Sequence, residues 1–308
     1  MNRFYLILAA LLVISPVVQA EEEGFFQRLR PDVFLNTFWG KSVQSQNNSR
    51  PLTTEEQKKR ERISLEQDGY PYKPEIFVGT IRRAELPIIQ RFIYAGMDPN
   101  ENILGLPSLM HAAQSGRMDT VELLLKNGAD LNALNGRREN ALMMAIKLKN
   151  TKLASDLINR GINLKQQDID RWTALHHAVY QNNGDIMVKI IRKDPSLMNI
   201  PTNAGFTPLM TAIWQGNKPM VDVLVGLGSK LDVRDTGGNT PLHLAVSRNQ
   251  YSIAKELLEG GTDPNIENAK GWTPMDNALS DNNTDMAHLL LYYGGKPRKK
   301  DILPQQGR

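Results

Sequence analysis

The sequence contains no cysteine, and this absence removes several kinds of chemistry at once. Without thiols there is no disulfide framework, no thiolate zinc site, no cysteine nucleophile and no cysteine for lipid attachment. Stability must therefore come from packed apolar side chains. A chain of 308 residues with 41% hydrophobic composition can supply them.

The sequence also lacks a large excess of charge of either sign. Its formal net charge at pH 7 is only +4, and Arg3 contributes part of that. A basic cluster, Lys296-Pro297-Arg298-Lys299-Lys300, falls at the C-terminal end, where we expect a solvated tail. We therefore expect no nucleic-acid partner.

Long apolar runs are absent apart from Phe4 to Val18 at the N-terminus. That run is shorter than the roughly 20 residues that a membrane-spanning helix needs. With Arg3 before it and Val18-Gln19-Ala20 after it, the segment is typical of a Sec-type secretory signal. We predict cleavage after Ala20, no stable membrane insertion of the mature chain, and a periplasmic or secreted location. An uncleaved anchor is the alternative.

Side-chain arrangements typical of catalysis are missing as well. No nucleophile elbow, phosphate-binding loop or zinc-protease motif occurs. His176 and His177 are adjacent rather than four residues apart, so a helix would not present both on one face. Asp130, Asn132, Asp263 and Asn265 have the spacing of turn-forming residues. The sequence therefore predicts a protein that is not an enzyme and has no cofactor or metal site.

What the chain does contain is an internal repeat of 33 residues. Three tetrapeptides carry it: Thr207-Pro208-Leu209-Met210, Thr240-Pro241-Leu242-His243 and Thr273-Pro274-Met275-Asp276. Weaker copies continue upstream at Ala174-Leu175, Ala141-Leu142 and Ser108-Leu109. In five copies a Leu stands four residues before a Gly, as Leu124 does before Gly128. Such periodicity indicates a solenoid in which each unit packs on its neighbours.

The repeat carries its own helix boundaries. Thr can accept a hydrogen bond from an unpaired N–H at a helix start, and Pro suits the first helical position. Asn182 and its equivalents, and Gly128 and its equivalents, stand where a left-handed residue ends a helix. Two places depart from the pattern and could distort the stack: Lys149-Asn150 lacks the expected Gly, and Asp194-Pro195-Ser196 carries one extra residue.

This pattern resembles the ankyrin repeat over about Pro74 to Gly295. The resemblance implies an all-α solenoid of about six clear repeats plus one degenerate N-terminal repeat, Glu75 to Asn100. Its units would be helix-turn-helix with projecting hairpin loops. We expect four segments: a signal peptide (1–20), an N-terminal extension or cap (21–73), the ankyrin-repeat domain (74–295) and a basic flexible tail (296–308).

The extension has two parts with different character. Four of the eight Phe fall between Phe25 and Trp39, a stretch that either covers the first repeat or docks on a partner or membrane surface. The charged run Thr53 to Gln67 predicts a solvated helix, and Gly69 to Pro74 should break it.

In ankyrin proteins the residues before the Thr and those ending the first helix form a concave surface that contacts partners. Carried over position by position, this predicts the following partner-binding residues: Trp172, Phe206, Asn239 and Trp272 before the Thr, and Tyr180, Gln181, Trp214, Gln215 and Arg248 at the helix ends. Alternatively, the aromatic residues before the Thr pack against the adjacent loop. Arg137, Arg138 and Arg171 add positive charge that would favour an acidic partner.

The resemblance to periplasmic bacterial ankyrin proteins implies an exported, non-enzymatic scaffold. We expect a monomer that binds another protein. A link to oxidative-stress protection, as in some Gram-negative members, is compatible with the resemblance. Two alternatives stay open: an immunity protein that neutralises a periplasm-targeted toxin, and a secreted effector that acts on a host protein.

Overall fold

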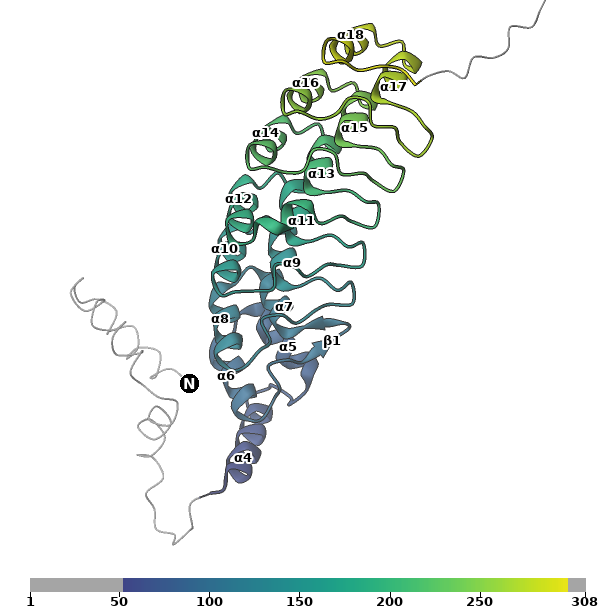
Figure 1. Ribbon diagram of the computed structural model, residues 1–308. Helices are drawn as coiled ribbons and strands as arrows, with labels where there is room; N and C mark the ends of the chain where they lie inside the picture. Colours follow the sequence, from purple (N-terminus) through teal and green to yellow (C-terminus); the bar gives the residue numbers. More distant parts are fainter. Residues whose placement is uncertain (1–51, 299–308) are drawn as a thin grey trace, which may run out of the picture. The chain divides into compact units, whose positions relative to one another are not determined.

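The structure, a computed structural model, describes residues 52–298. Between Thr54 and Arg298, the chain forms one compact unit of antiparallel helix pairs stacked side by side (Figure 1). The first helices of the pairs are α5 (Pro74–Arg83), α7 (Ser108–Ser115), α9 (Ala141–Lys147), α11 (Ala174–Tyr180), α13 (Pro208–Trp214), α15 (Pro241–Ser247) and α17 (Pro274–Ser280). The second helices are α6 (Leu86–Tyr94), α8 (Met118–Lys126), α10 (Thr151–Asn159), α12 (Gly184–Lys193), α14 (Lys218–Gly226), α16 (Tyr251–Glu259) and α18 (Thr284–Tyr292). The predicted all-α solenoid is confirmed, with the degenerate repeat as the α5–α6 pair.

The helices begin where the repeat pattern predicts. Thr207 and Thr240 accept hydrogen bonds from the backbone N–H three residues on, at 3.3 and 3.4 Å, and a Pro follows each of them. Asn140 replaces Thr before α9 and accepts the same bond from Met143 at 3.1 Å. The cap is therefore conserved in chemistry although the residue differs, because either oxygen satisfies an unpaired N–H.

The helices also end as expected, in left-handed residues. Asn182 has φ +56° and Gly128 φ +91°. Lys149 adopts φ +58° in place of the expected Gly, and Asn150 caps the next helix by accepting from Leu153 at 3.0 Å. The extra residue near Asp194 is absorbed by a short 3-10 helix, η1 (Pro195–Asn199). Neither irregular place interrupts the succession of helix pairs.

The hairpin loops that follow the pairs bond to one another. Within a hairpin, a backbone N–H donates to a carbonyl four residues on, as from Asp168 to Trp172 at 3.0 Å. Equivalent tips are joined as well, as from Ile169 to Arg137 at 3.0 Å. This second bond recurs from Gly136 to Gly105, from Asn203 to Asp170, from Thr236 to Ala204 and from Ala269 to Gly237. The loops therefore form a backbone ladder, visible on the right of Figure 1, that holds the side chains of the tips in register.

The turns behind the ladder are organised by the predicted Asp and Asn residues. Asp130 accepts from the backbone of Asn132 at 2.8 Å, and Asp263 from that of Asn265 at 2.9 Å. Asn132 in turn accepts from the backbone of Asn163 in the next repeat at 2.8 Å. These carboxylates shape turns, as their spacing predicted.

The first hairpin is the one place where residues 52–298 form strand. β1 (Asn102–Ile103) pairs antiparallel with β2 (Leu106–Pro107), and Leu104 and Gly105 make the turn between them. Both turn residues have positive φ, +55° and +76°. The Leu104 side chain is fully exposed at this tip.

The charged segment before the repeats forms the expected helix, and most of its side chains are exposed or half-exposed, but the helix is also docked on the repeats. α4 (Thr54–Gln67) lies against α6 and covers the open side of the first pair. Leu65 is completely buried there, and Arg62 donates from Nε to the carbonyl oxygen of Ala95 at 2.8 Å. Arg91 on α6 pairs with Glu61 at 2.5 Å. The charges of α4 are thus partly satisfied by α6, which the sequence of α4 alone could not reveal.

Several expectations concern residues outside the described range. The signal segment, the Phe-rich stretch Phe25 to Trp39 and most of the basic tail beyond Arg298 belong to them. Among residues 52–298, no helix combines the length and apolar character needed to cross a bilayer.

Candidate functional site

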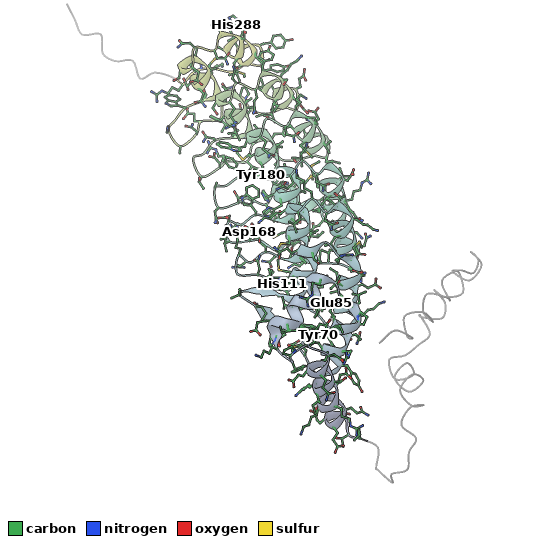
Figure 2. All side chains as sticks on the ribbon, turned by 180° about the vertical axis from the view of Figure 1, so that it is seen from behind. Tyr70, Glu85, His111, Asp168, Tyr180 and His288 are labelled. Carbon is green, nitrogen blue, oxygen red and sulfur yellow. The ribbon has the colours of Figure 1, made fainter. Side chains whose placement is uncertain are left out.

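We call inner surface the side of the stack formed by hairpin tips and the ends of the first helices. It comprises residues 135–139, 168–172, 202–206, 235–239 and 268–272 at the tips, and 147–149, 180–182, 214–216, 247–249 and 280–282 at the helix ends. His111, Asp168 and Tyr180, labelled in Figure 2, follow one another along the stack. All nine predicted partner-binding residues belong to this surface.

Two aromatic pairs form the middle of the inner surface. Trp172 packs edge-to-face on Tyr180, with ring centroids 5.5 Å apart. One repeat further, Phe206 packs on Trp214 in the same way, at 5.9 Å. Each pair joins a hairpin to the end of the helix that follows it, since the two partners are eight positions apart in the sequence in both cases.

The two members of each pair differ in exposure. Tyr180 is 49% exposed and Trp214 48%, whereas Trp172 and Phe206 are half-buried beneath them. Trp172 also contacts the ring of His177, 5.2 Å away. The residues before the Thr therefore support the surface, and those at the helix ends offer free aromatic area.

The remaining predicted residues are placed as follows. Gln215 donates to the carbonyl oxygen of Tyr180 at 2.8 Å, which ties neighbouring helix ends together. Asn239 bonds to Asp235 at 3.2 Å and accepts from Asn268 at 2.8 Å, so it organises its own hairpin. Gln181 is half-buried at the end of α11.

At the C-terminal end of the surface, Trp272 is half-buried beside a hollow of 270 Å³. The hollow is lined mainly by α15, α17 and the last two hairpins, and Leu244 and Ser247 contribute to it. A larger hollow of 480 Å³ lies on the outer helices α16 and α18, around Tyr251 and His288. The smaller one therefore continues the aromatic surface, and the larger one does not.

Arg248 completes this surface at the end of α15. Its guanidinium carbon lies 4.1 Å from the centroid of the Trp214 ring. Such stacking of a cation on an aromatic face is favourable by about 0.5–1 kcal/mol at exposed sites. Trp214 is therefore contacted by Phe206 on one side and by Arg248 on another.

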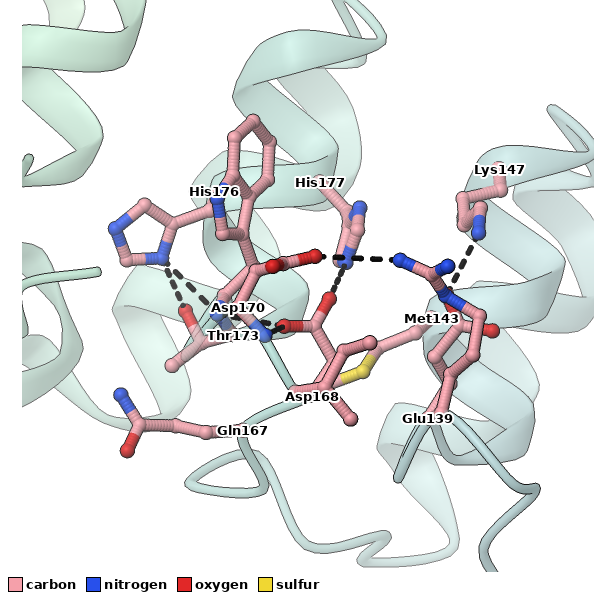
Figure 3. A network of polar contacts seen from close by, with 12 residues as sticks. Glu139, Met143, Lys147, Gln167, Asp168, Asp170, Thr173, His176 and His177 are labelled. Atoms are coloured by element: carbon pink, nitrogen blue, oxygen red, sulfur yellow. Dashed lines mark hydrogen bonds and ion pairs between the residues drawn. The ribbon is translucent and has the colours of Figure 1, made fainter. Parts of the chain in front are cut away.

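A buried charge cluster flanks the aromatic pairs, and the sequence analysis missed it (Figure 3). Lys147 donates from Nζ to Glu139 Oε1 at 2.6 Å, and His177 Nε2 lies 2.9 Å from Asp168 Oδ2. Glu139, Asp168 and His177 are all buried. The sequence did carry a signal for this cluster. Glu139 and Lys147 stand 33 residues before Trp172 and Tyr180, so one repeat has an ionic pair at the positions where the next has an aromatic pair.

Hydrogen bonding keeps both carboxylates ionised. Burial raises the pKa of Glu139, but hydrogen bonds from Lys147 and Asn135 outweigh it, and the net pKa is lowered. Burial likewise raises the pKa of Asp168, and the bonds from His177 and the Trp172 backbone outweigh it to lower the net value. Both carboxylates are thus ionised at neutral pH, and the Lys147 ammonium group supplies a positive charge beside Glu139.

We tested whether this cluster fits a metal ion. One ligand atom each from Glu139, Asp168 and His177 lies within 4.8 Å of the others. Lys147 already bonds to one Glu139 oxygen, and Asn135 donates to the other at 2.8 Å. Asp168 Oδ1 accepts two backbone N–H groups. A cation would have to displace the ammonium group of Lys147, so the donor set fits an internal ion-pair network better than a metal.

The histidines that match the repeat pattern are structural. His176 and His243 are buried, and each Nδ1 lies at hydrogen-bonding distance from the Thr that starts its helix. Burial, opposed by the hydrogen bond to the Phe206 carbonyl, lowers the pKa of His176 to about 4. A neutral imidazole held on both sides by the backbone is poorly placed to exchange protons with a substrate.

The positive tips predicted from the sequence are only partly free. Arg137 pairs with Asp170 of the next tip at 3.2 Å. Arg138 and Arg171 are exposed and have left-handed backbone, each with φ +60°.

The comparisons with known proteins agree with this architecture. A family model described as ankyrin repeats (3 copies) matches residues 80–168, 142–235 and 224–301, which together are more than half of the chain. The phosphocholine transferase AnkX of Legionella pneumophila is 30% identical over 141 residues, which are 44% of this chain and 15% of that protein. Human inversin is 29% identical over 150 residues, 48% of this chain and 14% of inversin. The chain therefore spans less than a fifth of either relative.

Solved structures show the same fold. The ankyrin repeat domain of Bcl-3 superposes with a TM-score of 0.64 at 21% identity, covering 70% of this chain and 97% of that one. An ankyrin repeat domain from Acinetobacter baumannii gives a TM-score of 0.57 at 24% identity, covering 61% and 98%. At these identities the likeness establishes the fold alone.

Proposed function

The chain belongs to the ankyrin-repeat family, and from this premise we propose that it is a non-enzymatic scaffold that binds another protein through its inner surface, after export to the periplasm or beyond. The observation that carries the proposal is the pair of half-exposed aromatic side chains, Tyr180 and Trp214, on adjacent helix ends. Large aromatic side chains dominate binding energy at interfaces because they bury much area with few rotatable bonds.

Rigid presentation is the mechanism that the fold supports. Trp172 and Phe206 hold the two exposed rings from below, and Gln215 ties their helix ends together. The backbone ladder fixes the hairpins that carry the supporting rings. A partner would thus meet a surface that is already ordered, which lowers the entropic cost of binding.

The test is capture from a periplasmic extract with tagged protein, Glu21 to Arg308, followed by a measured Kd for each protein identified. The Tyr180→Ala/Trp214→Ala variant should raise Kd about 30-fold or more, since a hot-spot aromatic contributes about 2 kcal/mol or more. The matched control is Tyr251→Ala/Leu227→Ala, which removes two exposed apolar side chains of the outer side, 46% and 41% exposed. Equal affinity of both variants would overturn the proposal.

Export is a separate part of the proposal and rests on the N-terminal sequence. Fractionation of cells and N-terminal sequencing should find a chain that begins at Glu21 in the periplasm or medium. A chain in the cytoplasm that still begins at Met1 would contradict it. The proposed monomeric state is checked by sedimentation of the same material.

The resemblance supports a link to oxidative-stress protection, tested by peroxide survival of a strain that lacks the gene. The identity of a captured protein discriminates the two other readings: a toxin would indicate an immunity protein, and a host protein an effector.

A further inference from the structure

Arg248 and Trp214 form a planar shelf on the inner surface. The guanidinium carbon stands 4.1 Å from the ring centroid, and the ring itself packs on Phe206. Stacking restricts the orientation of a guanidinium group, so less conformational entropy is lost when it forms further bonds. Arg248 is thus pre-oriented, although it lies on an exposed helix end.

The donors of this guanidinium group are unused. Within residues 52–298, the Arg248 side chain makes no hydrogen bond or ion pair. Arg91 and Arg137, by contrast, each pair with carboxylates of the chain. An oriented guanidinium with free donors matches the geometry of a carboxylate, which it can bind through two parallel hydrogen bonds.

The charges around the shelf favour an anionic ligand. On the inner surface, as far as the structure describes it, five basic side chains take part in no ion pair: Arg138, Lys149, Arg171, Arg248 and Lys270. Two carboxylates are likewise without one, Asp235 and Asp281, and Asp235 is occupied by the backbone of its own turn. The uncompensated charge of this surface is therefore positive, which complements acidic side chains of a partner.

Exposed aromatic side chains border the shelf on one side, and a hollow with both polar and apolar lining borders it on the other. Trp214 and Tyr180 expose about half of their side chains on the N-terminal side. On the other side, the hollow of 270 Å³ begins at Ser247, the residue next to Arg248, and extends to Trp272. A segment that crosses Arg248 would therefore place its neighbouring side chains against Tyr180 and Trp214 on one side and against Leu244 and Trp272 of the hollow on the other.

We infer that Arg248, stacked on Trp214, binds an Asp or Glu side chain of the partner, in a segment whose neighbouring side chains are apolar. This rests on the proposed function, because it specifies the chemistry of the partner at the same surface. The carboxylate would accept two hydrogen bonds from the guanidinium group, and the adjacent apolar side chains would contact Trp214 and the hollow.

The probe is a fluorescein-labelled peptide with blocked ends in which Glu alternates with Phe and Leu. Its affinity is compared with that of the same peptide carrying Gln in place of Glu. Arg248→Gln should raise the Kd of the Glu peptide about 10-fold or more, since hydrogen bonds to charged groups contribute about 1.5–3 kcal/mol. Arg248→Lys should recover only part of the loss, because an ammonium group cannot form the planar pair. The matched control is Arg192→Gln, an exposed arginine of α12, which should leave Kd unchanged.

Three outcomes overturn the inference: no binding of the Glu peptide by the unaltered protein, equal binding of the Gln peptide, or unchanged affinity in Arg248→Gln. A Gln peptide with a free C-terminus tests the other source of a carboxylate, and tighter binding of that peptide also counts against the side-chain assignment. The proposed function and the inference about Arg248 can be distinguished by experiment. If an identified partner is lost with Tyr180→Ala/Trp214→Ala but retained by Arg248→Gln, the scaffold stands and only this inference falls.

Discussion

His176 donates a hydrogen bond from Nε2 to the carbonyl oxygen of Phe206, 3.1 Å away, so the first helix of one repeat holds the hairpin of the next. Its Nδ1 accepts from the backbone N–H of Thr173 at 3.2 Å, which requires the neutral ring with the proton on Nε2. His243 repeats the arrangement with Trp272 at 2.9 Å. The bond that Nδ1 accepts within the repeat therefore depends on an unprotonated imidazole, whereas the Nε2–H group that bonds to the next hairpin is present in both protonation states.

Stability should fall as the pH drops from about 6.5 towards 4. The pKa of His176 is about 4 in the folded protein, mainly through burial, against 6.5 when exposed. The unfolded chain binds more protons in that interval, so the free energy of unfolding decreases with falling pH. For His176 alone the loss between pH 7.5 and 5 is about 2 kcal/mol. The free energy of unfolding, measured with urea, should depend less on pH in His176→Gln than in the unaltered protein. The exposed His288→Gln, as the control, should show no such reduction. Identical pH dependence in the unaltered protein and both variants would refute this.

Lys147→Met should destabilise the fold more than its exposed position suggests. The substitution leaves the buried carboxylate of Glu139 with Asn135 and with the more distant Arg137 at 3.9 Å, but without the ammonium group that bonds to it at 2.6 Å. Loss of one partner of a buried, hydrogen-bonded charge costs about 1–3 kcal/mol. Lys149→Met, at an exposed lysine two residues on, is the control and should be nearly neutral.

A double-mutant cycle separates pairing from other effects. Glu139→Gln combined with Lys147→Met should cost less than the sum of the two single substitutions, since the neutral side chain no longer needs the ammonium group. If the loss of unfolding free energy in the double variant equals the sum of the losses in the two single variants, the two groups do not interact.

Leu65→Ala should destabilise the N-terminal end of the stack. Leu65 of α4 is completely buried, and truncation of a buried Leu typically costs about 2–5 kcal/mol. Hydrogen exchange should accelerate first in α5 and α6, because they lie nearest to the lost contact. Ile63→Ala, on the same helix with a side chain 47% exposed, provides the comparison and should change little. Equal effects of both would mean that α4 is not docked as described.

Leu104→Asn should stabilise the first hairpin. Leu104 has φ +55° in a two-residue turn, a conformation that costs most residues about 1–2 kcal/mol but that Asn tolerates. No packing is lost, because the leucine side chain is fully exposed. The urea midpoint should therefore rise for Leu104→Asn and fall for Leu104→Val, whose branched side chain disfavours positive φ further. A lower midpoint for Leu104→Asn would show that the turn is not strained.

The sequence by itself determined the repeat period and the helix boundaries. These features depend on local chemistry: the Thr240 hydroxyl bonds three residues on, Pro241 suits a first helical turn, and Asn182 tolerates a left-handed backbone. Each operates within a few residues, so the order of amino acids suffices to predict it.

Only the tertiary structure decided which side chains meet across repeats. Leu65 is buried because α4 lies on α6, and Trp172 supports Tyr180 while Glu139, one repeat earlier, bonds to Lys147 instead. The stacking of Arg248 on Trp214 joins residues that are 34 positions apart. Such contacts depend on the distance between neighbouring helices and on the rotamer that each side chain adopts there, and neither is encoded in the spacing of the repeat.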